Sequence, residues 1–306
     1  MNKQNLAEVF SRPNDRVRLS LTGRSRPSDP RITAIRNDLA DVAVSPRHFA
    51  PHYAAAMSFH CHAPWTMVRG KPGDGETAVT QLLHGERFHV LDLRAGWAWG
   101  YCAHDHYVGY VPVEALAPAA PDAATHRVEP GGALAFSHAD IKAPVAAFLP
   151  GGALVHGTIE GDFLACDAGY LHMRHLGPAK GSGDADLIGT ARAYLGMPYL
   201  WGGRGGGGVD CSGLVQIALA FCGVGVQRDT DQQAATVGRP LADDEALAGG
   251  DLVYFPGHVG IMTSGETLLH ANAHWMRVTE EPLADVVARL APLHAEPITA
   301  RRRIAP

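Results

Sequence analysis

One cysteine, Cys211, stands where a glycine-rich stretch meets apolar sequence with helical spacing. The segment "WGGRGGGGVDCSGLVQIALAFCG" covers residues 201–223, and its apolar residues recur at the helical period after the cysteine. If the helix begins at Cys211, the thiol lies among unpaired backbone N–H groups at the positive end of the helix dipole. Such surroundings favour the thiolate and lower a cysteine pKa by about one to several units. Cys211 is therefore a candidate nucleophile.

A nucleophilic thiol needs a base, and two of the 17 histidines are well placed. His258 and His270 lie in two apparent strands joined by the turn signal "TSGE". A Thr263–Ser264–Gly265 loop would place the two imidazoles directly opposite each other on one sheet face. A two-residue loop would place them on opposite faces. The first alternative allows a Cys-His-His constellation, in which His258 forms an ion pair with Cys211 and His270 orients His258. With the Cys211 N–H as oxyanion donor, the predicted chemistry is acyl transfer through a thioester.

The overall composition limits the function classes. The chain has 306 residues, 46% hydrophobic and 19% charged, and a formal net charge of −5. This balance disfavours a nucleic-acid or anionic-membrane partner. The five cysteines are scattered without a CxxC pair, so we predict no disulfide framework, no metal site and no cofactor. No apolar run has the length of a signal peptide or a membrane span, so we expect a cytoplasmic protein, and the oligomeric state stays open.

The composition and the hydrophobic periodicity of the sequence change along the chain. Residues 1–60 resemble an extended arm with one helix near "HFAPHYAAAM". The segment "GYVPVEAL" at 109–116 is repeated as "GYLHMRHL" at 169–176, which predicts two similar β-modules over 61–120 and 121–178. After the linker "GPAKGSGDAD", residues 184–306 show helical periodicity first and strand-like runs later. Two or three domains also fit the length.

Both regions resemble known families. The size and Gly-Tyr-aliphatic signature of the two modules resemble bacterial SH3-like barrels. The blocks "PYLWGG…DCSGLV", "RDTDQQ", "GDLVYF…HVGIM" and "LLHAN" resemble, in this order, the NlpC family of papain-like cysteine peptidases that act on bacterial cell-wall peptides. The expected fold class is therefore α+β, with a papain-like NlpC catalytic domain preceded by two small all-β SH3-like barrels.

The resemblance to the NlpC family implies roles for individual residues. It makes Cys211 the nucleophile, His258 the base and His270 the orienting third residue, and it places Tyr199 near the oxyanion. The further positions that it matches to substrate binding are Asp210, Ser212 and Thr230, the last where relatives often carry serine.

The whole layout is similar to that of cytoplasmic γ-D-glutamyl-L-diamino acid dipeptidyl-peptidases, which recycle murein peptides. This resemblance implies cleavage after L-Ala-γ-D-Glu in small murein peptides with a free N-terminus. In such enzymes the first β-module caps the cleft. Glu86 is then the candidate partner of the substrate ammonium, and Tyr107 the residue reaching toward Cys211. A carboxylate closing one end of a cleft selects an ammonium group and rejects capped substrate.

Other interpretations compete with these. The C-terminal domain can be a non-catalytic scaffold for cell-wall binding, or an amidase or acyltransferase acting on another amide. Arg204 and Arg228 fit either a substrate carboxylate or surface ion pairs. Cys222, on the apolar helix face, is expected in the core. The third residue of the substrate, lysine or diaminopimelate, is not determined by the sequence.

Overall fold

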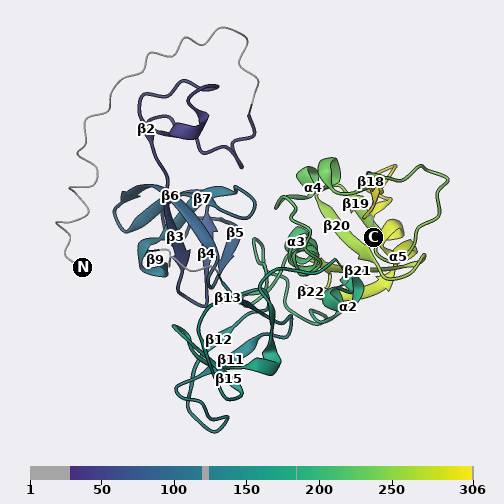
Figure 1. Ribbon diagram of the computed structural model, residues 1–306. Coiled ribbons are helices and arrows are strands. Elements are labelled where there is room, and N and C mark those ends of the chain that lie inside the picture. The colour runs from purple at the N-terminus through teal and green to yellow at the C-terminus, as the bar shows by residue number, and fades with distance from the viewer. Residues whose placement is uncertain (1–27, 119–123, 184, 305–306) are drawn as a thin grey trace.

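The computed structural model describes residues 28–118, 124–183 and 185–304. They are rich in sheet and carry few helices, as the expected α+β class requires. Two β units and a C-terminal unit that combines helices with a sheet lie around a common junction (Figure 1). Within the described residues, no helix is long and apolar enough to cross a membrane.

The described segment before the first β unit, residues 28–56, consists of turns, two short strands and a 3-10 helix. It pairs β1 with β2 in parallel, and β1 leads into a short 3-10 helix. The helix predicted near residues 48–57 is wrong, because this region carries β2 and the start of β3. Pro51 has no N–H to donate and restricts the residue before it, which disfavours a helix there. The elements are β1 Ala40–Asp41, the 3-10 helix Val42–Val44 and β2 Tyr53–Ala54.

The first β unit is a seven-stranded sheet of order β5-β4-β8-β7-β6-β3-β9 with antiparallel pairing throughout. Alternating side chains fill a core that includes Val68, Phe88 and Val111. The sheet begins at β3, inside the region predicted to be an arm. Its elements are β3 Met57–Cys61, β4 Trp65–Arg69, β5 Ala78–Leu83, β6 Arg87–Arg94, β7 Trp97–Cys102, β8 Val108–Pro112, a 3-10 helix Val113–Ala115 and β9 Leu116–Pro118.

The second β unit contains two sheets, of order β13-β10-β17 and β12-β11-β16-β15-β14. The sequence repeat has the same local structure in both units, a strand, a 3-10 helix and a strand. This likeness agrees with two related β-modules. The elements are β10 His126–Val128, β11 Ala133–Phe136, β12 Val145–Leu149, β13 Leu154–Val155, β14 Thr158–Glu160, β15 Phe163–Cys166, β16 Gly169–His172, a 3-10 helix Met173–His175 and β17 Leu176–Pro178.

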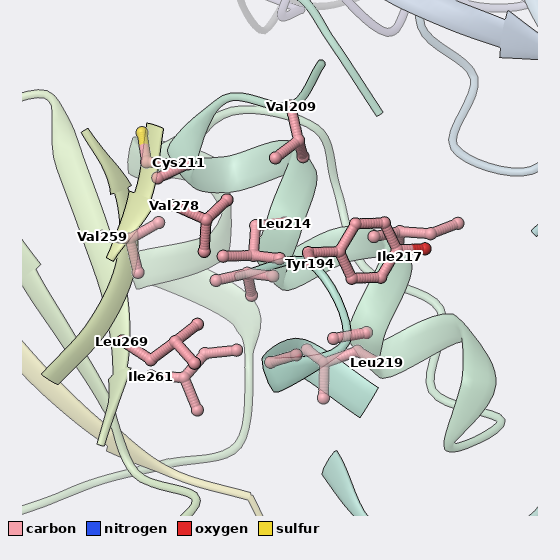
Figure 2. Close-up of a cluster of buried hydrophobic side chains, with 14 of the residues drawn as sticks. Tyr194, Val209, Cys211, Leu214, Ile217, Leu219, Val259, Ile261, Leu269 and Val278 are labelled. Carbon is pink, nitrogen blue, oxygen red and sulfur yellow. The ribbon is translucent and has the colours of Figure 1, made fainter. Parts of the chain in front are cut away.

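The C-terminal unit is built on a six-stranded sheet of order β18-β23-β19-β20-β21-β22. Helix α3 packs against β20 and β21, and apolar side chains from both sides fill the space between them (Figure 2). Nine of the eleven α3 residues are buried, as expected of a helix that is apolar on all sides. The elements are α2 Leu187–Arg192, α3 Cys211–Phe221, α4 Thr230–Thr236, β18 Arg239–Pro240, β19 Leu252–Phe255, β20 His258–Met262, β21 Thr267–Asn272, β22 Arg277–Pro282, α5 Leu283–Leu290 and β23 Ala300–Arg303.

The first β unit contacts the glycine-rich loop that precedes α3. The Gln81 amide oxygen accepts the backbone N–H of Arg204 and of Gly206, each at 2.9 Å, and its Nε2 donates to the Gly206 carbonyl at 2.7 Å. A Cβ at Gly206 would collide with the Trp65 ring, so only glycine allows this approach. The loop is therefore shaped by the first β unit.

A buried ion pair joins the same two parts of the chain. Arg204 donates to both carboxylate oxygens of Glu86, at 2.7 and 3.0 Å, and the two residues are only 2% and 8% exposed. Arg204 is thus neither a surface arginine nor free to bind a substrate carboxylate. Its charge is satisfied within the protein.

We predict that Glu86→Met and Arg204→Met each destabilise the fold by about 3–5 kcal/mol, because each leaves one buried charge without its partner. The double variant is expected to recover much of this loss. Urea denaturation of the four proteins measures the effect. A double variant that loses as much as both single losses combined would contradict the assignment.

Candidate active site

Helix α3 begins at Cys211, as predicted, and Asp210 caps it. One Asp210 oxygen accepts the Gly213 N–H at 2.8 Å, and the other accepts the Gly202 N–H at 2.8 Å. The second oxygen also receives the Arg228 guanidinium at 2.6 Å. Asp210 therefore fixes both the helix start and the loop that approaches it.

Arg228 is 1% exposed and connects three parts of the structure. Besides Asp210, it donates to the Ser212 hydroxyl at 2.8 Å and to the Thr80 hydroxyl of the first β unit at 2.9 Å. Like Arg204, Arg228 is buried in protein contacts and is not a surface arginine. Asp210 and Ser212, expected to bind substrate, both contact this guanidinium.

The surroundings of Cys211 differ from the prediction. The residue is 7% exposed. Burial and the neighbouring Asp210 raise the pKa of its thiol to about 12, against the lowering effects of the Val259 amide, Arg228 and the Ser212 amide. Burial therefore opposes the lowering of the thiol pKa that the helix start predicts.

The two histidines are in contact. Nε2 of His258 lies 2.8 Å from Nδ1 of His270, and the rings meet edge to face. The strand register pairs Ile261 with Leu269 and Met262 with Leu268. The loop therefore lies one residue later than predicted, so the histidines share a face but are offset by two residues from direct opposition. The two imidazoles still lie close together, because an offset of two residues leaves both side chains on the same face of the sheet.

The loop shift has a local cause. The Ser264 hydroxyl accepts the N–H groups of Glu266 and Thr267, each at 3.2 Å. The Thr263 N–H donates to the Thr267 carbonyl at 2.8 Å, which extends the ladder by one pair. The serine side chain thus stabilises a three-residue turn centred on Gly265.

Both imidazoles are neutral near pH 7. Burial lowers the pKa of His258 to about 3, and the adjacent His270 contributes to this lowering. Burial also lowers the pKa of His270. The free protein therefore holds a neutral imidazole and a protonated thiol, where the sequence predicted an ion pair. A neutral imidazole can accept the thiol proton as the sulfur–carbon bond forms, so attack needs no preformed ion pair.

Sequence reasoning missed a carboxylate behind His270. Nε2 of His270 lies 2.9 Å from Oε1 of Glu281, whose other oxygen receives Arg289 Nη2 at 2.5 Å. On β22, Thr279 pairs with His270 and Glu281 pairs with Leu268. Thr279 and Glu281 share a face, so the β21–β22 register was the signal that would have found Glu281.

Five of the predicted residues line one cavity of about 360 Å³ together with Cys211. The five are Tyr107, Tyr199, Asp210, Ser212 and Thr230. Burial and the nearby Cys211 raise the pKa of Tyr199, so its hydroxyl keeps its proton and can donate. Tyr107 belongs to the first β unit, so that unit forms part of the wall.

Glu86, His258 and His270 are not among the residues that line this cavity, and the role predicted for Glu86 requires a correction. Glu86 lines a different cavity, of about 430 Å³, at the junction of the three units. Both its oxygens are engaged by Arg204, and Oε2 also accepts the Leu83 N–H at 2.9 Å. Because it is buried, paired and outside the cavity of Cys211, Glu86 is not retained as the partner of a substrate ammonium.

A different acidic group lies at the cavity of Cys211. Tyr107 donates to Asp229 Oδ2 at 2.9 Å, and Arg31 donates to the same oxygen at 2.9 Å. Arg31 also pairs with Asp29 and Asp231, each at 2.7 Å. Three carboxylates thus surround one guanidinium, which leaves a surplus of negative charge. The contacts of Arg31 with Asp229 and Asp231 join residues 198 and 200 positions apart, so no local pattern could predict them.

We predict that the Cys211 thiol stays protonated between about pH 6 and 9 in the free protein. Ultraviolet thiolate absorbance, taken as the difference between wild type and Cys211→Ala, is expected to stay flat over this range. Thiolate absorbance from Cys211 at neutral pH would show instead a preformed ion pair.

Family models match two parts of the chain. Residues 68–116 match the bacterial dipeptidyl-peptidase SH3 domain, and residues 196–289 match the NlpC/P60 family. No curated protein matches the chain.

Solved structures resemble the chain at different levels. An NlpC/P60 family protein from Bacillus cereus ATCC 10987 shares 18% identity over 81% of this chain and 100% of its own, with a TM-score of 0.67. An NlpC/P60 endopeptidase from Photobacterium damselae subsp. piscicida shares 12% identity over 80% of this chain and 71% of its own, with a TM-score of 0.56. The NlpC/p60 domain of the peptidoglycan hydrolase SagA is 31% identical over 34% of this chain and 91% of its own, with a TM-score of 0.30. The first two show a shared fold.

Proposed function

We propose that this chain, which belongs to the NlpC/P60 family of cell-wall cysteine peptidases through its C-terminal domain, cleaves the γ-D-glutamyl-diamino acid bond of short murein peptides with a free N-terminal L-Ala. One observation carries the proposal. The Cys211 thiol opens into a cavity whose wall includes the first β unit and whose carboxylates exceed its cations. The match of residues 68–116 to a bacterial dipeptidyl-peptidase SH3 domain supports the same substrate class.

Covalent catalysis begins with attack of the Cys211 sulfur on the γ-carbonyl carbon of D-Glu. The thiol proton passes to His258 as the carbon–sulfur bond forms. Negative charge develops on the carbonyl oxygen, where the Cys211 N–H and the Tyr199 hydroxyl can donate. Collapse of this intermediate breaks the carbon–nitrogen bond, and the imidazolium of His258 protonates the leaving amine of the diamino acid.

Hydrolysis of the thioester completes the cycle. Water attacks the same carbonyl carbon while His258 takes one of its protons. The carbon–sulfur bond then breaks, the Cys211 sulfur recovers the proton from His258, and L-Ala-D-Glu leaves. His270 keeps the His258 ring oriented through both steps.

Selection of a free N-terminus follows from the charge of the cavity. A substrate ammonium is attracted by the carboxylates around Arg31, of which Asp229 and Asp231 line the cavity with side chains 26% and 66% exposed. Thr230 and Ser212 offer hydroxyl groups beside the same cavity. An acylated N-terminus lacks the charge and adds bulk, so it loses this attraction.

Three further points remain predictions. The second β unit is expected to be an SH3-like barrel, since it repeats the local structure of the first. The protein is expected in the cytoplasm, in recycling of murein peptides. The boundaries of the domains, 61–120, 121–178 and 184–306, follow the repeat and the linker.

We predict that Cys211→Ala loses all release of diaminopimelate from L-Ala-γ-D-Glu-diaminopimelate, since the substitution removes the thiol that lines the cavity. Chromatography of the free diamino acid measures the release. Cys222→Ala is the matched control, because Cys222 lies outside the cavity of Cys211, and it is expected to keep full activity. Equal release by wild type and Cys211→Ala would end the proposal, and no release by wild type would favour the scaffold alternative.

We predict that N-acetylation of the same substrate lowers kcat/KM by about 100-fold or more, because a charge-assisted contact and the fit to a closed end are both lost. Steady-state kinetics on the matched peptides measures the ratio. Equal turnover of the acetylated peptide would favour the alternative of an amidase or acyltransferase with broader substrates.

A further inference from the structure

We propose that Glu281 is a positioning residue of the catalytic machinery, which sets the tautomers of both histidines so that His258 presents an unprotonated Nδ1 for the thiol proton. The inference rests on the proposed cysteine chemistry but not on the identity of the substrate. It extends the predicted set of three residues by a fourth, on a neighbouring strand.

The hydrogen bonds determine the tautomers step by step. The ionised carboxylate of Glu281 can only accept, so Nε2 of His270, 2.9 Å away, carries a proton and donates. A neutral His270 then has a lone pair on Nδ1. That lone pair lies 2.8 Å from Nε2 of His258, which must therefore carry the proton of this contact. A neutral His258 is left with its lone pair on Nδ1.

The position of His258 makes that lone pair useful. His258 precedes Val259 on β20, and the Val259 backbone amide contacts the Cys211 sulfur. Without Glu281, either nitrogen of His270 could carry the proton. In the opposite arrangement His258 would hold its proton on Nδ1 and could not act as the base through that atom.

Glu281 is itself held in place and ionised. Burial alone would raise its pKa, but hydrogen bonds from Arg289, His270 and Trp275 outweigh burial and lower it to about 2. Arg289 Nη2 lies 2.5 Å from Oε2, and Trp275 Nε1 lies 3.3 Å from Oε1. Arg289 lies on α5, which follows β22 directly, and His270 lies on β21. The carboxylate of Glu281 is therefore held by residues of two other elements.

The neighbouring Glu280 provides a matched control. It stands on the same strand and is also engaged, with Arg192 at 2.7 Å and the Thr263 hydroxyl at 2.6 Å. It pairs across the strand with Leu269, whereas His270 pairs with Thr279. Glu280 thus faces the other side of the sheet from the histidines. The same change of charge at Glu280 tests for general effects of the substitution.

The kinetic test compares Glu281→Ala, Glu281→Asp and Glu280→Gln with wild type on L-Ala-γ-D-Glu-diaminopimelate. We expect Glu281→Ala to lower kcat by about 10- to 100-fold with KM within about twofold, since the histidines do not bind the ground state. Glu281→Asp is expected to recover part of kcat, and Glu280→Gln to behave as wild type. An unchanged kcat in Glu281→Ala, or an equal loss in Glu280→Gln, overturns the inference.

A second measurement requires no turnover and leaves Glu281 and both histidines unaltered. Imidazole nitrogen NMR shifts of the otherwise unaltered Cys211→Ala protein report which ring nitrogen of His258 and His270 carries the proton. We expect the Nε2–H tautomer in both residues. An Nδ1–H tautomer in His258 overturns the inference. Absence of murein peptide cleavage with the expected tautomers would instead count against the proposed substrate alone.

Discussion

The buried ion pair between Asp210 and Arg228 is the constraint on which the site depends. Asp210 caps α3 through the Gly213 N–H and holds the approach loop through the Gly202 N–H. Arg228 neutralises it and reaches the Thr80 hydroxyl of the first β unit. A carboxylate this buried is tolerated only with its charge paired and its oxygens hydrogen-bonded. Because all these contacts converge one residue before Cys211, the position of the thiol follows from the assembly of two domains.

The first β unit is consequently part of the candidate active site. Gln81 shapes the loop before Cys211, and Tyr107 contributes to the wall of the cavity. The negative charge beside Tyr107 comes from Asp229, which receives both the tyrosine hydroxyl and Arg31. Under the proposed function, a cavity whose wall is partly formed by another domain favours small, free peptides over an intact polymer.

The sequence pattern predicted those structural features that depend on interactions between residues close together in the chain. The start of α3 at Cys211, the strands of His258 and His270 and their shared face follow from capping, periodicity and a turn signal. The turn between these strands lies one residue later than predicted, because hydrogen bonds to the Ser264 hydroxyl stabilise that register. Ion pairs and burial that involve residues far apart in the sequence could not be predicted, and they account for the differences between the predicted and the observed site. Glu86 pairs with Arg204 across 118 positions, which removes it from the cavity, and burial raises the thiol pKa that the helix start alone would lower.

The thioester between Cys211 and the L-Ala-γ-D-Glu part of the substrate is the intermediate on which the proposed function depends. Rapid-quench mass spectrometry of the protein during turnover of L-Ala-γ-D-Glu-diaminopimelate tests for it most directly. We expect a transient adduct with the mass of the dipeptidyl group, located on the peptide that contains Cys211. An adduct on another residue, or turnover without any covalent intermediate on Cys211, would contradict the proposed function.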